Sequence, residues 1–199
     1  MIYLLRHGET EWNREGRLQG HGDSPLTERG LSQAVAMGGA LRRAIGDAAL
    51  PDYSLVSSPL GRALATARFA AAVTGHDPAA IVEEPRLREC GFGSWEGEIY
   101  NEIEDLHPEA WRAREADRWN TQPPGGESYA QVAERVGTWL AEQDEAAKLI
   151  VVSHGLAGRI LRSLYSGAPQ EDVFTMSEPQ DAVFRLTGGR VESLPAREV

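Results

Sequence analysis

The chain has 199 residues, a length that suits one domain with a sizeable apolar core, and we expect a single domain over residues 1–199. Hydrophobic residues make up 41% of the sequence and charged residues 25%, a composition that excludes a disordered or fibrous protein. The formal net charge of −10 argues against nucleic-acid and anionic-membrane partners, because both need a basic surface. Since no apolar run approaches the roughly 18 residues of a membrane span, we expect a cytoplasmic protein.

The chain opens with a short apolar run that ends in a polar triplet. Residues 2–5 are long enough for one buried strand of an α/β sheet, and Arg6, His7 and Gly8 follow directly. Ligands of open α/β sheets bind beyond the carboxyl ends of strands, and a glycine there lets the backbone approach a ligand closely. The triplet is therefore the first candidate for a functional site.

A long segment without helical periodicity follows the triplet. Residues 11–26 contain several glycines and a proline, which predicts a loop over the end of the first strand, and its length indicates a functional loop. Thr27 is the predicted N-cap of the next helix, whose apolar residues are spaced for one buried face. Gly46 and Pro51 are expected to end this helix.

A second strand and helix form a corner that suits an anion. Residues 53–56 are a short buried-strand candidate, and the next helix is predicted over 59–74, with Ser58 as its N-cap and Pro59 at its first position. Arg62 then lies in the first turn, where free amide groups and the positive end of the helix dipole favour an anion. Its guanidinium adds a full charge and two parallel donors.

The middle of the chain has a different character. Residues 80–83 are a third strand candidate, and the stretch 91–126 that follows combines aromatic and acidic residues and ends in Pro-Pro-Gly-Gly. We interpret residues 91–126 as an excursion from the sheet with two short helices, over 99–106 and 109–119. Such an excursion would cover the site as a lid and select the substrate.

The last third of the chain returns to the alternation of strands and helices. Ser128 and Gln131 form a capping box that starts an amphipathic helix extending to about Asp144. The remaining predicted elements are a strand over 148–152, a helix over 156–165, paired edge strands over 182–186 and 191–194, and a frayed end over 196–199. This order predicts an α/β fold of three layers, α/β/α, around a mostly parallel sheet, with the helical excursion after the third strand.

Two histidines stand out by position. His7 and His154 each end a buried strand and precede a glycine, and in a mostly parallel sheet the strand ends at His7, Ser58 and His154 can converge. The other histidines and the single cysteine lack this context and are interpreted as structural, packing or exposed residues: His21, His76, His107 and Cys90.

A metal site and an anion site both use histidines, and the neighbouring residues favour the anion. A metal site would need clustered ligands, and no His-x-His or His-Glu-x-x-His spacing occurs. Arg6 lies directly beside His7, and a permanent positive charge there opposes a cation and attracts a phosphoryl group. We expect Arg6, Arg62 and a protonated His154 to surround one phosphate, with His7 as nucleophile and with no metal and no cofactor.

Several separate motifs, in order and over nearly the whole chain, closely resemble the histidine phosphatase superfamily, the phosphoglycerate mutase-like clan. They are the segments 5–10 (LRHGET) with 12–13 (WN), 18–20 (LQG), 25–30 (PLTERG), 57–63 (SSPLGRA), 87–89 (LRE), 125–128 (GGES) and 152–155 (VSHG). The resemblance implies a metal-independent phosphoryl transfer through a covalent phosphohistidine, as in histidine acid phosphatases. By these motifs His7 is the nucleophile, and the phosphoryl group is bound by Arg6, Asn13, Arg62, His154 and Gly155.

The same resemblance assigns the substrate loop and the proton donor. Gln19 and Gly20 match the loop that contacts the substrate. Glu89 matches the residue that protonates the leaving group, with Glu83 and Glu84 as alternative acids.

Residues after Glu89 distinguish between the mutases and the phosphatases of the family. The mutases of this family carry a tyrosine three positions after the acid, a lysine soon afterwards and an adjacent arginine pair. Here Phe92 takes the first position, no lysine precedes Lys148, and Arg112 and Arg114 are separated by one residue. The segment 92–97 (FGSWEG) instead resembles the broad-specificity and α-ribazole phosphatase branch.

The expected protein is a phosphoric monoester hydrolase acting on a small-molecule phosphate ester. A cofactor-dependent phosphoglycerate mutase and a catalytically silent phosphate-binding module remain as alternatives. We expect no nucleic-acid or membrane partner, and a homodimer is one possible assembly.

Overall fold

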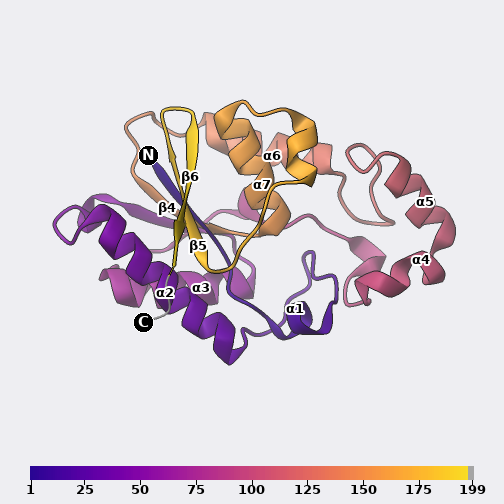
Figure 1. The fold of residues 1–199 in the computed structure, drawn as a ribbon, viewed down its shortest axis with the longest axis horizontal. Coiled ribbons are helices and arrows are strands. Elements are labelled where there is room, and N and C mark those ends of the chain that lie inside the picture. The colour runs from indigo at the N-terminus through magenta and orange to yellow at the C-terminus, as the bar shows by residue number, and fades with distance from the viewer. Residues whose placement is uncertain (197–199) are drawn as a thin grey trace.

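A six-stranded sheet with the strand order β3-β2-β4-β1-β5-β6 forms the centre of the protein, whose computed structural model describes residues 1–196 (Figure 1). The four strands β3, β2, β4 and β1 run parallel, and β5 and β6 continue the sheet antiparallel. The predicted α/β class with a mostly parallel sheet is confirmed. The strands are β1 (Ile2–Arg6), β2 (Ser54–Ser57), β3 (Val82–Glu83), β4 (Leu149–Ser153), β5 (Ala182–Thr187) and β6 (Arg190–Pro195).

Helices cover both faces of the sheet, as the three-layer prediction requires. They are α1 (Glu11–Glu15), α2 (Glu28–Ile45), α3 (Gly61–Thr74), α4 (Ile103–Leu106), α5 (Pro108–Ala116), α6 (Tyr129–Ala141) and α7 (Gly155–Ser166). Short 3-10 turns occur at Leu50–Asp52, Pro78–Ala80, Pro85–Leu87, Gly93–Trp95, Tyr100–Glu102 and Gln170–Phe174.

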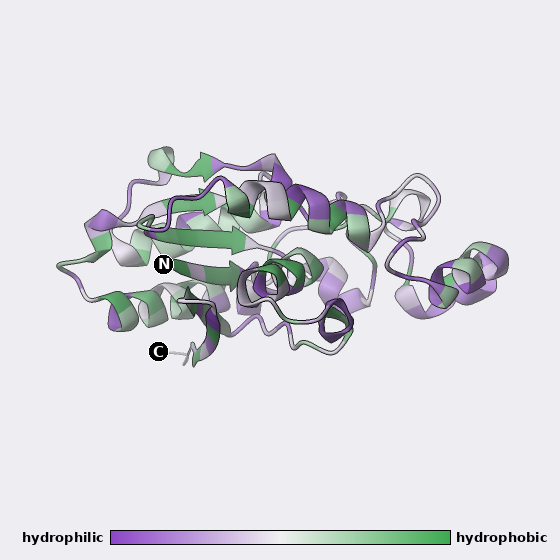
Figure 2. Ribbon diagram, turned by 90° about the horizontal axis from the view of Figure 1, so that it is seen from above, coloured by the Kyte–Doolittle hydropathy of each residue, from purple (hydrophilic) through white to green (hydrophobic). Residues whose placement is uncertain are grey.

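The alternation of side chains along β1 divides the core into two. Ile2 and Leu4 belong to the apolar cluster formed with α6 and α7, whereas Tyr3 and Leu5 belong to the cluster formed with α2 and α3. Every residue of β4 is buried, because helices pack on both of its faces (Figure 2). No helix within residues 1–196 is both long and apolar enough to cross a bilayer.

The segment predicted as a loop over 11–26 contains the short helix α1. The Thr10 hydroxyl accepts the Asn13 amide at 3.2 Å, and the Asn13 side chain accepts the Thr10 amide at 3.2 Å, which makes a capping box. Gly16 ends the helix in the left-handed region, with φ +73°. The loop prediction is wrong here because a five-residue helix is too short to show periodicity.

The start of α3 differs from the prediction by two residues. The helix begins at Gly61, and Leu60, without a side-chain hydrogen bond, is its N-cap in place of Ser58. The Ser58 hydroxyl instead lies 2.7 Å from His154 Nε2, across the ends of two neighbouring strands. Arg62 nevertheless lies in the first turn of α3, as predicted.

The segment 91–126 leaves the sheet and carries α4 and α5 to one side of the molecule (Figure 1). Its helices are shorter than predicted, since the residues before Ile103 form a 3-10 turn and α5 ends at Ala116. The fully buried Trp95 stacks on His107, and Trp111 lies at the same ring distance of 6.1 Å. The aromatic residues of this segment therefore give it a small core of its own.

The remaining helices and strands agree with the predicted elements, but several are shorter than predicted. The Ser128 capping box starts α6, which ends at Ala141 rather than at Asp144. The third strand is reduced to Val82–Glu83 at the sheet edge. Of the end predicted to fray, Ala196 is buried and donates its amide to the Asp181 carbonyl, and residues 197–199 lie outside the described part.

Candidate active site

The carboxyl ends of three adjacent parallel strands bring the two singled-out histidines together. In the sheet register Arg6 of β1 lies beside Ser153 of β4, so the next residues, His7 and His154, are neighbours. Their ring centroids are 5.2 Å apart. Ser58, after the end of β2, approaches from the other side of β4. The predicted convergence at this sheet edge is confirmed.

The His7 ring is held in one tautomer. Its Nδ1 donates to the Gly8 carbonyl at 2.8 Å, and Arg62 Nε donates to its Nε2 at 3.3 Å. Burial, followed by the positive charges of Arg62 and Arg6, holds the pKa of His7 well below 6.5. The ring is therefore neutral, with its proton on Nδ1 and a lone pair on Nε2.

His154 is buried behind His7 rather than exposed in the cavity. Its Nε2 shares a hydrogen bond with Ser58, and its Nδ1 has no hydrogen-bond partner among the described residues. Burial first, then Arg62 and His7, hold its pKa well below 6.5. Without a bound phosphate, this lowering of the pKa opposes a positive charge on His154; a protonated His154 beside a bound phosphate stays a prediction.

Arg62 connects the base of the cavity to the loop after α1. Its Nη1 donates to the Gly22 carbonyl at 2.7 Å and to the Asp23 carboxylate at 3.1 Å, and its Nη2 donates to the Gly20 carbonyl at 2.8 Å. Only 2% of the residue is exposed. Its position is therefore fixed before any substrate arrives.

The loop that carries the predicted substrate residues Gln19 and Gly20 is held by an acid that sequence reasoning missed. Glu96 accepts the backbone amides of His21 and Gly22, each at 2.9 Å. Gly20 has a φ of +54°, and a Cβ atom there would lie 2.2 Å from the Glu96 carboxylate. A glycine is required at this point both by the conformation and by the close approach.

Glu178 is a second acid that the sequence analysis did not identify. It lies on the segment before β5, where its carbonyl accepts a hydrogen bond from Arg6. Its carboxylate is 3.5 Å from Arg6 Nη1 and 3.1 Å from Arg159 Nε. A Cβ atom at Gly155 would come within 2.5 Å of this carboxylate, so the predicted site residue Gly155 makes room for Glu178.

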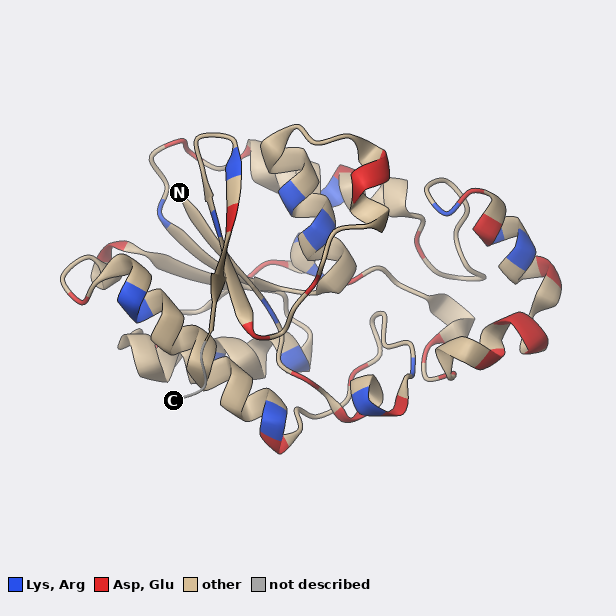
Figure 3. Cartoon of the chain, in the orientation of Figure 1, with Lys and Arg blue, Asp and Glu red and all other residues tan. Residues whose placement is uncertain are grey.

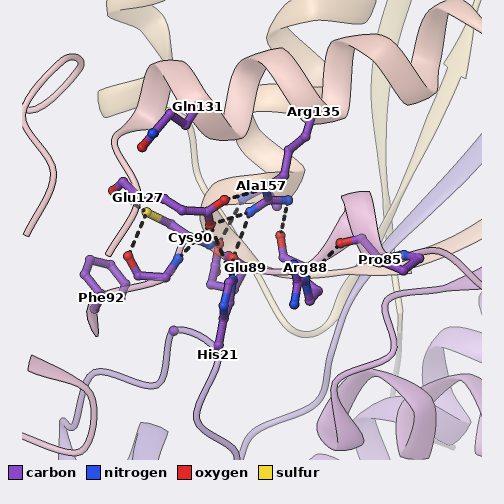
Figure 4. A network of polar contacts seen from close by, with 12 residues as sticks. His21, Pro85, Arg88, Glu89, Cys90, Phe92, Glu127, Gln131, Arg135 and Ala157 are labelled. Carbon is purple, nitrogen blue, oxygen red and sulfur yellow. Dashed lines mark hydrogen bonds and ion pairs between the residues drawn. The ribbon is translucent and has the colours of Figure 1, made fainter. Parts of the chain in front are cut away.

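Glu89 presents its carboxylate to the first turn of α7 (Figure 4). The carboxylate accepts the amides of Leu156 at 3.2 Å and Ala157 at 3.1 Å. The alternative acids lie elsewhere, since Glu83 is exposed in β3 and Glu84 pairs with Arg86. Of the three candidate acids, Glu89 is the one that lines the cavity.

A cavity of about 330 Å³ opens beside these residues. Asn13 also lines it, although its Oδ1 is occupied by the capping box and by Gln180. Figure 3 shows the lysine and arginine positions in blue and the acidic positions in red, with Glu104 and Asp105 together on α4. No group of three or more potential metal ligands occurs within residues 1–196. The lining residues are Arg6, His7, Asn13, Arg17, Leu18, Gln19, Gly20, Arg62, Glu89, Phe92, Tyr100, Arg118, Tyr129, Leu156, Arg159 and Glu178.

Comparison with known proteins agrees with this arrangement. The model of the histidine phosphatase superfamily (branch 1) matches residues 2–191, and the chain belongs to this family. Its relatives and solved neighbours include phosphatases and a protein named as a mutase, which places the chain among phosphatase- and phosphotransferase-type proteins.

Three similar proteins illustrate the range within the family. The α-ribazole phosphatase of Shigella flexneri superposes with a TM-score of 0.80 at 25% identity, covering 100% of this chain and 96% of its own. A mycobacterial glucosyl-3-phosphoglycerate phosphatase gives a TM-score of 0.73 at 28% identity, covering 92% and 90%. A Salmonella paratyphi C protein named "Probable phosphoglycerate mutase GpmB" is 37% identical over 174 residues, 84% of this chain and 75% of the relative. The resemblance stated from the motifs is confirmed.

Proposed function

We propose that the protein is a metal-independent phosphatase that hydrolyses small-molecule phosphate monoesters through a phosphohistidine on His7. One observation carries the proposal, the state of the His7 imidazole. The ring is buried and neutral, its Nδ1 donates a hydrogen bond to the Gly8 carbonyl, its Nε2 accepts one from Arg62, and the charge of Arg6 also acts on it. A neutral ring nitrogen is the form that can attack phosphorus.

The residues around His7 have separate roles in the first step. Arg6 and Arg62 bind the phosphoryl oxygens and stabilise the charge of the transition state. The buried Arg6 Nε has no hydrogen-bond partner among the described residues. When the dianion binds, its charge favours protonation of His154, which then contributes a further positive charge.

The reaction balances in two steps. In the first, His7 Nε2 forms a bond to phosphorus, the ester P–O bond breaks, and Glu89 gives its proton to the leaving oxygen. In the second, water attacks the phosphohistidine, the N–P bond breaks, and Glu89 takes the water proton. Glu89 therefore has to be protonated at the start of the first step and ionised at the start of the second.

The segment 91–126 is proposed to select the leaving group. Phe92, Tyr100 and Arg118 of this segment line the cavity. The two aromatic rings offer a surface that suits organic phosphates larger than a three-carbon acid, and Arg118 adds a positive charge. This supports a range of monoesters as substrates.

Mutase action is the second candidate, favoured by the relative named as a phosphoglycerate mutase. Against it, the mutases carry an adjacent arginine pair where this chain has Arg112 and Arg114, separated by one residue, and neither of these lines the cavity. Arg112 is exposed, and Arg114 is buried over the rings of Phe92 and Tyr129. The named functions of the solved neighbours also favour hydrolysis.

The test is to incubate the protein with a labelled phosphate monoester and to locate the label. We expect acid-labile, base-stable label on His7, absent from His7→Ala and present in His21→Ala. Label that persists in His7→Ala would contradict the assignment. Activity that disappears with a chelator and returns with a divalent metal would contradict a metal-independent reaction.

A parallel assay separates the alternatives. Release of inorganic phosphate from several monoesters supports the phosphatase, whereas interconversion of phosphoglycerates without phosphate release supports the mutase. Binding of phosphate without turnover of any monoester would indicate a silent module.

A further inference from the structure

A single arginine of α6 binds the main chain around the proposed proton donor. Arg135 has all five of its N–H donors in use: Nη1 donates to the carbonyls of Arg86 at 2.7 Å and Arg88 at 2.8 Å. Its Nη2 donates to the carbonyl of Glu89 at 2.8 Å and to the Glu127 carboxylate, and its Nε donates to Glu127 at 2.9 Å. The acid-bearing segment is thus fixed by one planar group (Figure 4).

We propose that Arg135, together with Glu127, is a positioning residue that holds Glu89 in the orientation needed for proton transfer. The proposal rests on the proposed function, in which Glu89 protonates the leaving group. Arg135 does not line the cavity, and its hydrogen bond to the Glu89 carbonyl connects it to the site.

Glu127 binds the main chain on the C-terminal side of Glu89. Its carboxylate accepts the amide of Gly91 at 2.9 Å, and its own amide donates to the Gly91 carbonyl at 2.8 Å. His21 Nε2 lies 2.9 Å from the Glu89 carbonyl and 3.3 Å from the Glu127 carboxylate. The residues on both sides of Glu89 are therefore bound to the same ion pair.

The carboxylate end of Glu89 is fixed independently by α7. The amides of Leu156 and Ala157 bind its two oxygens, while Arg135 binds its carbonyl. Residues of α6 and α7 pack in the same apolar cluster, so the backbone and the side chain of Glu89 are held by two helices of one layer of the fold. Release of the backbone would let the carboxyl shift relative to the leaving oxygen.

Arginine suits this place better than lysine. Five donors in one plane can bind three carbonyls and a carboxylate at once, whereas an ammonium group has three donors. The side chain of Arg135 is 15% exposed and that of Glu127 is 22% exposed, so both charges are largely withdrawn from water and each needs the other. A conservative change to lysine keeps the charge and removes part of the binding.

The test uses the leaving group as the readout. The parameter kcat/KM reports the steps up to phosphoryl transfer to His7, in which Glu89 acts only as the proton donor. An alkyl phosphate therefore depends on Glu89 in kcat/KM, and 2,4-dinitrophenyl phosphate does not. For Arg135→Lys we expect kcat/KM to fall about ten-fold for the alkyl phosphate, and to stay within about two-fold for the dinitrophenyl ester, as a misplaced but present acid would give. Glu89→Gln should show the same pattern with a larger loss.

A matched control and a double variant complete the design. Arg86→Lys removes an arginine from the same segment without changing a side-chain contact to Glu89, and should leave both substrates unaffected. In Glu89→Gln/Arg135→Lys the second change should add no further loss on the alkyl phosphate, because the two residues act through one proton transfer. Equal losses on both substrates, or additive losses in the double variant, would overturn the inference.

The outcomes separate this inference from the proposed function. If Glu89→Gln does not discriminate between the two leaving groups, the role of Glu89 as proton donor is wrong. If Glu89→Gln discriminates and Arg135→Lys does not, Arg135 has no positioning role. Activity on the dinitrophenyl ester also shows that each variant is folded.

Discussion

Arg62 Nε donates a hydrogen bond to His7 Nε2 over 3.3 Å, and this contact joins the proposed nucleophile to the charge that would stabilise its transition state. The same guanidinium is bonded to the carbonyls of Gly20 and Gly22. The substrate loop and the nucleophile are therefore aligned by one side chain.

Replacing Arg62 with lysine should impair catalysis strongly. A lysine has three donors and cannot bind His7, the carbonyls of Gly20 and Gly22 and a phosphoryl oxygen at once, so we expect kcat/KM to fall about 100-fold or more. Steady-state kinetics on an aryl phosphate measures this. Arg68→Lys, at an exposed position of the same helix, is the matched control. A loss below about five-fold for Arg62→Lys would contradict the role.

The buried histidines predict how stability depends on pH. Burial and nearby arginines lower the folded-state pKa of both His7 and His154 below 6.5, so below about pH 6.5 the unfolded chain binds more protons than the folded protein. Stability should rise with pH through this window and decrease as the pH falls below 6.5. The contribution is at most about 1.4 kcal/mol per pH unit for each histidine.

Chemical denaturation at pH 7.5 and 5.5 measures this dependence. His154→Gln can keep a hydrogen bond to Ser58 and removes one titrating group, so its stability should change less between the two pH values than that of the unsubstituted protein. If both proteins change in stability by the same amount between pH 7.5 and pH 5.5, His154 does not contribute to the pH dependence.

Removing the charge of Glu178 should strengthen the binding of inorganic phosphate. Its carboxylate pairs with Arg6 and Arg159 inside the cavity and competes there with a bound anion. For Glu178→Gln we expect the inhibition constant of phosphate to fall about three- to five-fold, the size of a partly exposed ion pair, with a larger effect at low salt. Glu192→Gln, in an exposed pair on β6, is the control. Weaker inhibition in Glu178→Gln would mean that Glu178 orients the arginines.

Cys90 should be inert to thiol reagents in the folded protein. It is fully buried, and desolvation raises the pKa of its thiol far above the usual range, so the reactive thiolate is scarce. A colorimetric thiol assay should detect no reaction under native conditions and one equivalent per chain in denaturant. Cys90→Ser should give no reaction in either state.

The sequence predicted those parts of the site that depend on local patterns. Strand ends located His7 and His154, the start of a helix located Arg62, and a motif located Glu89; the structure brings these residues to one cavity edge or directly behind it. The roles assigned to them remain predictions until the variants are measured.

The residues that the sequence did not indicate make contacts with parts of the chain that are far away in sequence. Glu178 contacts Arg6 across 172 positions of sequence, and Arg135 reaches the Glu89 carbonyl across 46, so no local spacing indicates either contact. Ser58 shows the opposite error, because a serine before a proline is a good N-cap pattern. Its hydroxyl does accept the Leu60 amide, but it also bonds to His154 across the sheet edge, and the helix begins only at Gly61. Glu96 was part of a recognised motif, yet its bonds to the loop amides could not be read from that motif.

The strand order has a consequence for the kinetics of folding. β1 and β2 do not pair with each other, since β4, from the last third of the chain, is inserted between them. A growing chain that has not reached Leu149 therefore cannot bring His7 and Ser58 into their final relation. Closure of this long connection is an entropically costly and late event. Recovery of enzymatic activity during refolding should coincide with completion of the centre of the sheet, so that turnover itself reports when the native topology has formed.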